Sequence, residues 1–210
     1  MKDQLLTGLF TRVLPSELMW QVKTDEKVVY LTFDDGPIPE LTEEILQILS
    51  KYNAKATFFC VGENVARNPE IYAKILEQGH ATGNHTHRHL KGWSTGFKEY
   101  LEDVETAGKY IKSTLFRPPY GLITYKQAKM LSKDYRVVMW SVLTKDYDPS
   151  VSKEACLASA VQGTWPGAII VFHDNIKARE RVVYALPRYL EHLEKEGFRA
   201  EKLTVSNTDD

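Results

Sequence analysis

The sequence has few of the features that would place the protein in a specialised class. Lysine and arginine number 27 against 28 acidic residues, and a net charge of -1 gives no electrostatic basis for nucleic-acid binding. The longest apolar runs fall well short of the ~20 residues that span a bilayer. No internal repeat, low-complexity tract or linker divides the chain. A soluble globular domain of 210 residues with one core fits this composition, which is 43% hydrophobic and 26% charged.

Cysteine is scarce, with only Cys60 and Cys156, which lie far apart in apolar surroundings. One disulfide between them is possible, but nothing in the sequence requires it. We therefore expect two buried free thiols, as suits a reducing compartment.

The first residues lack the pattern of a secretory signal. The segment from Leu5 to Phe10 is apolar, but Lys2 is offset by Asp3 and no small-residue cleavage site follows. We predict that residues 1–25 form an N-terminal extension packed on a main domain of residues 26–210. A peripheral membrane contact through its apolar residues is the alternative. A cytoplasmic or loosely membrane-associated protein is expected, with export left open.

Short apolar runs alternate with longer amphipathic segments along the chain. Strands are predicted at Val28–Phe33, Ala56–Val61, His80–Asn84, Leu115–Phe116, Val137–Val142, Ala168–Phe172 and Phe198–Val205. Helices are predicted at Leu41–Tyr52, Pro69–Gln78, Phe97–Ser113, Tyr125–Lys133, Lys153–Val161 and Arg181–Glu196. This βα alternation favours a parallel sheet with outer helices, either a barrel or an open doubly wound sheet. Active sites in both lie at the C-terminal ends of the strands.

End signals are clear for the helix predicted at Pro69–Gln78. Asn68 can cap its free N–H groups, Pro69 suits the first helical position and Gly79 suits the C-terminal stop. Pro187 should kink the last helix or delay its start.

Two adjacent acids, Asp34 and Asp35, end the first predicted strand and are followed by Gly36 and Pro37. These four residues are also typical of an ordinary turn. Two neighbouring carboxylates repel each other unless a cation intervenes, however, so the pair suggests one acid for a metal and one for proton transfer.

Three histidines, His85, His87 and His89, follow another predicted strand. One turn of helix would place His85 and His89 on the same face, a common way to bring two nitrogen ligands to a metal. His87 points elsewhere and is the expected non-ligand. Two histidines with one carboxylate leave coordination positions open, as in catalytic sites. Zn²⁺ fits this ligand set, and Fe²⁺, Co²⁺ or Ni²⁺ could also use it.

Two further strand ends carry polar side chains. His173 follows the buried run that begins at Ile169, and Arg117 precedes the rigid Pro118-Pro119 pair and Tyr120. Each residue alone is as well explained by a structural role, but their gathering at strand ends favours a shared site.

These motifs together resemble the polysaccharide deacetylases of carbohydrate esterase family 4, which share the NodB homology domain. The resemblance runs from about Val28 to the C-terminus. Thr32-Phe33-Asp34-Asp35 is similar to the first family motif, His85-Thr86-His87-Arg88-His89 to the second, Arg117-Pro118-Pro119-Tyr120 to the third and Val171-Phe172-His173 to the fifth. The resemblance implies a distorted (β/α) barrel with about seven strands.

The fourth motif departs from the family pattern D-x-x-D-W. Leu143 stands where the first Asp is expected and Tyr147 where Trp is expected, while Asp146 is kept. These departures are expected to affect the sugar-binding surface more than the catalytic reaction.

The resemblance also implies roles for the residues. Asp35, His85 and His89 would bind one divalent metal, with Zn²⁺ favoured and Co²⁺ or Ni²⁺ possible. Asp34, paired with Arg117, would act as general base towards the attacking water, and His173, oriented by Asp146, would protonate the leaving amine. A backbone N–H near Tyr120 would help to stabilise the oxyanion. Substrate contacts are predicted for the aromatic and proline side chains Tyr120, Pro119, Tyr147 and Trp93, whereas Trp140 is predicted to belong to the core.

The implied activity is hydrolysis of the N-acetyl groups of amino sugars in a peptidoglycan- or chitin-like polysaccharide or oligosaccharide, with release of acetate. One alternative is a deformylase or deacetylase of a lipid-linked sugar or a small amide. A non-catalytic carbohydrate-binding module is a third reading, which the filled base, acid and ligand positions disfavour.

Overall fold

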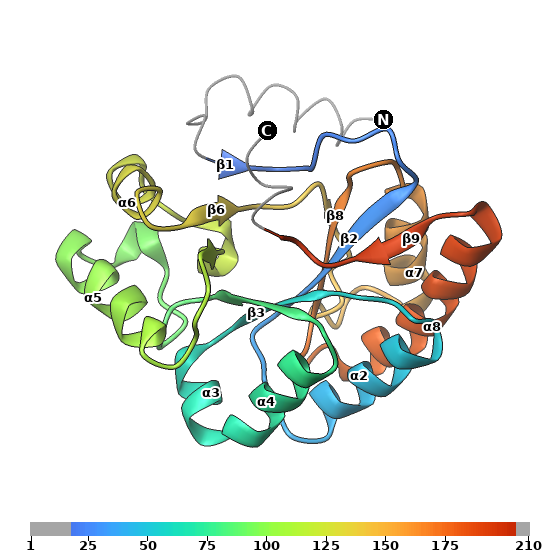
Figure 1. The fold of residues 1–210 in the computed structure, drawn as a ribbon, viewed down its shortest axis with the longest axis horizontal. Coiled ribbons are helices and arrows are strands. Elements are labelled where there is room, and N and C mark those ends of the chain that lie inside the picture. The colour runs from blue at the N-terminus through green and yellow to red at the C-terminus, as the bar shows by residue number, and fades with distance from the viewer. Residues whose placement is uncertain (1–17, 205–210) are drawn as a thin grey trace.

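A curled sheet of parallel strands forms the centre of the molecule, and helices surround its outer face (Figure 1). This computed structural model describes residues 18–204. Within them the sheet has nine strands: β1 (Leu18–Met19), β2 (Val28–Asp34), β3 (Thr57–Cys60), β4 (Ala81–Asn84), β5 (Leu115–Phe116), β6 (Arg136–Val138), β7 (Val142–Leu143), β8 (Ile169–His173) and β9 (Arg199–Glu201).

The strand order is β1-β6-β5-β4-β3-β2-β8-β7, and β9 also pairs with β2. Every ladder between these strands is parallel. The fold is therefore the predicted α/β fold. The curled sheet forms a half-barrel, which agrees with the distorted NodB-like barrel that the resemblance implied. Because all ladders are parallel, the C-terminal ends of the strands gather at one edge of the sheet, where Asp34 pairs with His173 in register.

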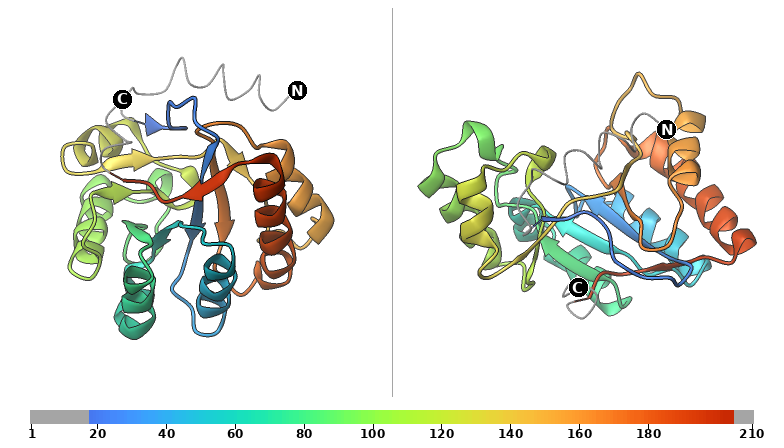
Figure 2. Two further views of the ribbon diagram at one scale, coloured as in Figure 1. Left: turned by 45° about the vertical axis from the view of Figure 1, so that its right-hand side comes forward. Right: turned by 90° about the horizontal axis from the view of Figure 1, so that it is seen from above.

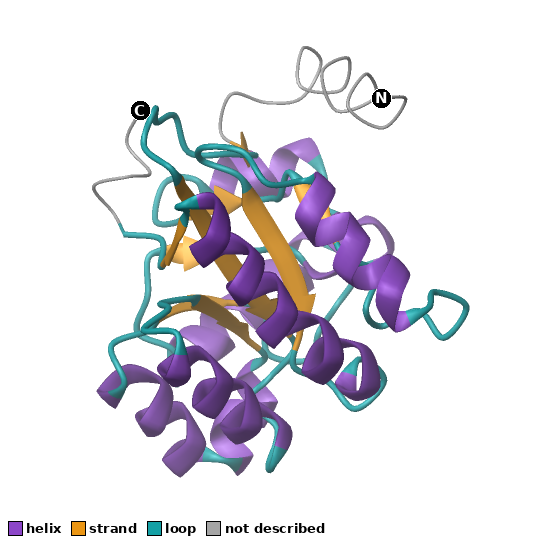
Figure 3. Cartoon of the chain, turned by 90° about the vertical axis from the view of Figure 1, so that its right-hand side faces the viewer, coloured by secondary structure: helices purple, strands orange, loops and turns teal. Residues whose placement is uncertain are grey.

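The helices pack around the strands on several sides, as two further views show (Figure 2, Figure 3). They are α2 (Leu41–Lys51), α3 (Gly62–Arg67), α4 (Pro69–Glu77), α5 (Phe97–Gly108), α6 (Tyr125–Leu131), α7 (Lys153–Gln162) and α8 (Arg179–Glu196), with short 3₁₀ turns at Gly92–Ser94 and Pro119–Gly121. The central strand β2 is buried along its whole length, which explains its continuous apolar pattern. Among residues 18–204, no helix is both long enough and apolar enough to cross a membrane.

The strand predicted at Val137–Val142 is two strands in the structure. β6 pairs with β5, whereas β7 pairs with β8, so the chain changes neighbours at residues 139–141. The connecting backbone is bound from both sides: Met139 N–H donates to the carbonyl of Met19, and Ser141 N–H donates to that of Ile169. Ser141 is the single polar residue in this run, and buried valines stand on both sides of it, so the sequence pattern does not mark the break.

β1 is the other strand that the sequence did not predict. It pairs with β6, and the segment after it reaches the start of β8, where Gln21 forms an antiparallel bridge with Ala168. Val22 is buried nearby. The described part of the predicted extension, residues 18–25, is thus joined to the sheet. Residues 1–17 lie outside the described residues, and the boundary at residue 25 stays a prediction.

One prediction about helix ends is wrong, and another is wrong in part. Asn68 makes no side-chain cap to α4; its amide donates instead to the carbonyls of Pro37 and Asn64. Pro187 does not delay the start of the last helix, since it lies inside α8, which begins at Arg179, earlier than predicted; a kink at Pro187 stays a prediction. The stop at Gly79 is confirmed, since this residue has a φ of 79° that glycine adopts without strain. Cys60 and Cys156 are buried free thiols, as predicted.

Candidate active site

The two adjacent acids at the end of β2 have different partners. Asp34 is buried, and its Oδ1 accepts a hydrogen bond of 2.7 Å from Nη1 of Arg117. Asp35 has a φ of 89°, which is rare for a residue with a Cβ, and its carboxylate lies near His85 and His89 instead. The Asp35 backbone is held there because its N–H donates to Phe59 and its carbonyl accepts from Nδ2 of Asn64 at 2.7 Å. The two carboxylates therefore do not share one environment.

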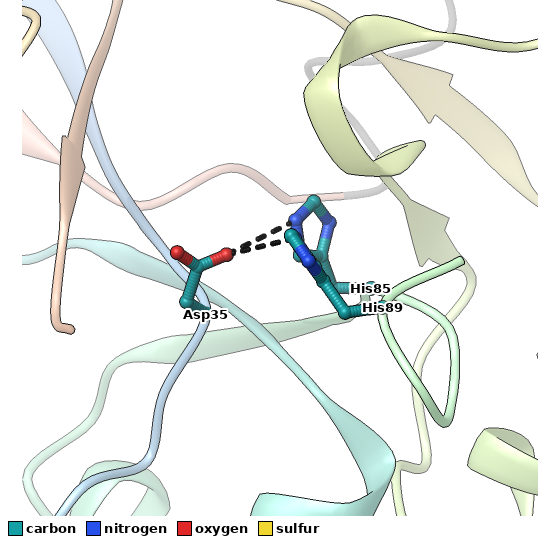
Figure 4. Close-up of side chains that lie close together, drawn as sticks. All are labelled: Asp35, His85 and His89. Atoms are coloured by element: carbon teal, nitrogen blue, oxygen red, sulfur yellow. Dashed lines mark ion pairs between the residues drawn. The ribbon is translucent and has the colours of Figure 1, made fainter. Parts of the chain in front are cut away.

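Asp35, His85 and His89 place three metal-ligand atoms within 4.8 Å of one another (Figure 4). Oδ1 of Asp35 lies 3.0 Å from Nε2 of His89 and 3.6 Å from Nε2 of His85. Ligands at ordinary zinc bond lengths in a tetrahedral site stand about 3.3 Å apart, so these separations fit a small divalent metal. Nδ1 of His85 lies 2.7 Å from the carbonyl of Arg117, which fixes a proton on that nitrogen and leaves Nε2 free to ligate.

The electrostatics of Asp35 favour its ionised form. Burial alone would raise the pKa of its carboxyl group, but the hydrogen bonds of His85 and His89 and the charges of His85 and His173 outweigh burial, so the pKa lies well below its usual range. An ionised carboxylate beside two imidazoles is the donor set that a divalent cation requires.

His85 and His89 meet in a loop, without the turn of helix that would also have placed them on the same face. Residues 85–89 form a loop after β4 in which Thr86 and His89 have φ values of 63° and 57°. Asp103 of α5 holds this loop: its Oδ2 accepts from the N–H groups of His87 and Arg88 at 2.8 and 3.0 Å. The two histidines therefore come together, as predicted, because this non-local carboxylate binds the backbone N–H groups of the loop and fixes its shape.

His173 and Asp146 form a second polar pair, as the sequence predicted. Oδ1 of Asp146 lies 2.7 Å from Nδ1 of His173, and Oδ2 accepts from the backbone N–H of the same residue at 2.7 Å. Burial would lower the pKa of His173, but the charge and hydrogen bond of Asp146 outweigh it and raise the pKa to about 9. The imidazole is therefore protonated at neutral pH and can serve as a proton donor.

Arg117 is completely buried between the sheet and the site. Its guanidinium donates to Asp34 and Thr32, and to the carbonyls of Val138 and Met139, and it lies 4.1 Å from the ring centroid of Phe59. Burial lowers the pKa of Arg117, partly offset by Asp34, yet guanidinium groups stay protonated in proteins. Four directed hydrogen bonds hold both the guanidinium and the Asp34 carboxylate in place.

A cavity of about 540 Å³ joins these groups, which is large enough for a sugar residue. Asp34, Asp35, His85, His89 and His173 all line it. So do the predicted substrate-binding residues Tyr120 and Tyr147, and the ring of Tyr120 lies 4.6 Å from that of His89.

The other aromatic predictions have different outcomes. Trp140, predicted to be core, is only partly buried and lines the cavity; the break between β6 and β7 exposes it. Pro119 is buried and does not line the cavity. Trp93 is 69% exposed outside the cavity, with its Nε1 bonded to the carbonyl of Ile123. Substrate contacts by Pro119 and Trp93 remain predictions.

Sequence reasoning missed two polar residues directly after His173. Asp174 is buried, accepts from Gly36 N–H at 2.8 Å and from the Thr42 hydroxyl at 2.7 Å, and burial raises its pKa to about 8. A Cβ on Gly36 would lie 1.8 Å from this carboxylate, so only glycine fits there. Asn175 lines the cavity and donates to Asp35. Both residues come just after the end of a predicted strand, and this position was the sequence signal that could have identified them as site residues.

Comparisons with known proteins agree with this geometry. The profile of the polysaccharide deacetylase family matches residues 21–138, more than half of the chain. A peptidoglycan-N-acetylglucosamine deacetylase of Bacillus cereus is 36% identical over 191 residues, covering 86% of this chain and 88% of the relative. A chitooligosaccharide deacetylase of a Bradyrhizobium species is 32% identical over 195 residues, covering 83% and 88%.

A solved structure shows the same architecture. It is a crystal structure of a peptidoglycan N-acetylglucosamine deacetylase in complex with 4-naphthalen-1-yl-N-oxidanyl-benzamide, with a TM-score of 0.82 and 30% sequence identity. The similarity covers 89% of this chain and 91% of that one. It therefore includes the strands on which the site is built.

Proposed function

The chain belongs to the polysaccharide deacetylase family, carbohydrate esterase family 4, and on that premise we propose that it hydrolyses the N-acetyl groups of amino sugars in a peptidoglycan- or chitin-like glycan. The observation that carries the proposal is the convergence of three groups on one cavity: the Asp35-His85-His89 cluster, the Asp34–Arg117 pair and the His173–Asp146 pair. The products are acetate and a free amino sugar.

The metal cluster supplies the electrophilic part of this chemistry. A divalent cation held by Asp35, His85 and His89, for which we propose Zn²⁺, would polarise the amide carbonyl and make water more acidic. Two nitrogen donors and one carboxylate suit zinc, and Co²⁺ or Ni²⁺ could use the same donors.

The protein side chains move the protons. Asp34, held by Arg117, accepts a proton from the water that attacks the acetyl carbon. His173, cationic because of Asp146, donates its proton to the amine nitrogen as the C–N bond breaks. The walls formed by Tyr120, Trp140 and Tyr147 offer aromatic faces to a sugar ring.

The test is acetate release by the purified protein from chitooligosaccharides and peptidoglycan fragments, with and without a chelator. Release should require metal, and His85→Ala should lower it by more than about 10²–10³-fold, because the variant loses the metal as well as a donor to the site. His192→Ala, which removes an imidazole that stacks on Tyr189 away from the cavity, is the matched control. His85→Ala with normal metal content and normal release would contradict the assignment.

A formylated amino sugar should be assayed in parallel, because it tests the alternative substrate class. The names of the similar proteins favour an acetylated glycan, so release from the formyl substrate alone would redirect the proposal. Cellular location stays a prediction, which fractionation of the producing cells would test. The reading as a non-catalytic module is disfavoured because every predicted base, acid and ligand position faces the site.

A further inference from the structure

Asn175 makes the one polar contact to the metal-cluster carboxylate, among the described residues, that comes from outside the cluster itself. Its Nδ2 donates to Oδ2 of Asp35 at 2.6 Å, although 140 positions separate the two residues. Asn175 is half-buried and lines the cavity two positions after His173. Neither the motifs nor the mechanism above assign it a role.

The two oxygens of Asp35 are divided between different partners. Oδ1 faces the histidine Nε2 atoms at 3.0 and 3.6 Å, whereas Oδ2 is held by Asn175. Building on the proposed metal site, we propose that Asn175 is a positioning residue: it occupies Oδ2 and so reserves Oδ1 for the metal as a single-oxygen ligand. Such partners behind a ligand orient it and tune the affinity for the metal.

The amide of Asn175 is itself fixed in orientation. Its Oδ1 accepts a 3.0 Å hydrogen bond from the N–H of Ala178, in the turn before α8. Because a backbone N–H can only donate, the oxygen must face Ala178 and the NH₂ group must face Asp35. The backbone beside it is tied to the same strand end, since Asp174 N–H donates to the carbonyl of Asp34.

A neutral amide suits this position better than a charged donor. Lysine or arginine would compete with a cation for the negative charge of Asp35, and a second carboxylate would repel it. Asparagine donates one hydrogen bond and leaves the full charge of Asp35 for the metal. Asn175 thus orients the ligand without weakening it.

The experiment compares two serine variants of the full chain by competition titration with Zn²⁺. Asn175→Ser keeps a capping oxygen for Ala178 N–H but is too short to reach Asp35 as well, so the Kd for Zn²⁺ should rise about 10–100-fold. Asn68→Ser is the matched control, because the Asn68 amide donates to the backbone carbonyls of Pro37 and Asn64 and makes no contact with Asp35. Its Kd should change less than about tenfold.

The absorption spectrum of the Co²⁺-loaded protein gives a readout that a general structural role would not move. The spectrum should differ from that of the wild type in Asn175→Ser, where both Asp35 oxygens become available, and should be unchanged in Asn68→Ser. A wild-type Kd and spectrum in Asn175→Ser, or equal losses in both variants, would overturn the inference. Asn175→Thr, with the same capping hydroxyl, replaces the serine variant if that protein does not fold.

Failure of this inference and failure of the proposed function are distinguishable. If the wild-type protein binds no Zn²⁺ or Co²⁺, the proposed metal site fails. If the wild type binds metal and releases acetate while Asn175→Ser binds equally well, only the role of Asn175 is overturned.

Discussion

Single residues divide the chemistry of this site through their contacts. Asp34 and Asp35 are neighbours in sequence with identical side chains, yet one is paired with a buried guanidinium and the other with two imidazoles. The φ of 89° at Asp35 is what separates them, and bonds from Asn64 and to Phe59 hold that backbone. Contacts also set the state of His173: burial would lower its pKa, but the charge and hydrogen bond of Asp146, helped by the charges of Asp34 and Asp35, raise it.

The pH dependence of catalysis should follow the His173–Asp146 pair. With a pKa of about 9, His173 is protonated below that pH and loses its proton above it, so kcat/KM should fall on the alkaline side near pH 9. Asp146→Asn removes the opposing charge and should move that fall down by about 1–3 pH units. The pH–rate profile and the imidazole pKa measured by NMR would check this.

The uncharged neighbour of His173 provides the control. Tyr147 packs edge-on against the imidazole with ring centroids 4.8 Å apart, so Tyr147→Phe should leave the alkaline fall in place. An Asp146→Asn profile within about half a pH unit of the wild type would contradict the assignment. The raised pKa also stabilises the fold: this contribution is present below pH 6.5 and lost as the pH rises through about 9.

At the scale of elements, the sequence predicted strands and their polar ends better than the loops between them. β2 and β8 were predictable because buried parallel strands are continuously apolar and end where polar residues begin. The break between β6 and β7 was not predictable, because the valines on both sides of it are buried. The shape of the loop at residues 85–89 was also not predictable, because it depends on contacts with Asp103 of α5 that no local sequence pattern reveals.

Asp103 should therefore be necessary for the loop that presents His85 and His89. Asp103→Ala leaves two backbone N–H groups without their acceptor, each worth about 1–3 kcal/mol, and should lower the free energy of unfolding of the metal-free protein by about 2–6 kcal/mol. Urea denaturation would measure this loss.

Arg88→Ala separates the loop contacts from the ion pair. Arg88 also binds Asp103 through its side chain, but it is half-exposed, so its removal should cost less than about 1 kcal/mol. Equal losses in the two variants would show that the ion pair, and not the backbone contacts, holds the loop.

The whole molecule brings the proposed metal ligands together from two segments of the sheet. Asp35 follows β2, whereas His85 and His89 follow β4, and β3 lies between these strands. A shared ion would therefore bind the native arrangement and not the unfolded chain, in which the segments are separate. This couples metal binding to the stability of the whole fold.

Zn²⁺ should accordingly raise the melting temperature of the chelator-treated protein. At a free concentration of 100 times its Kd, a ligand that binds only the native state stabilises it by about 2.7 kcal/mol. In a chain of this size that corresponds to about 5–11 °C. His85→Ala should lose most of this increase in melting temperature, because the metal site then has two of its three protein ligands. The control His192→Ala should keep the increase. An equal shift in His85→Ala and the wild type would mean that the stabilising ion binds somewhere other than at Asp35, His85 and His89.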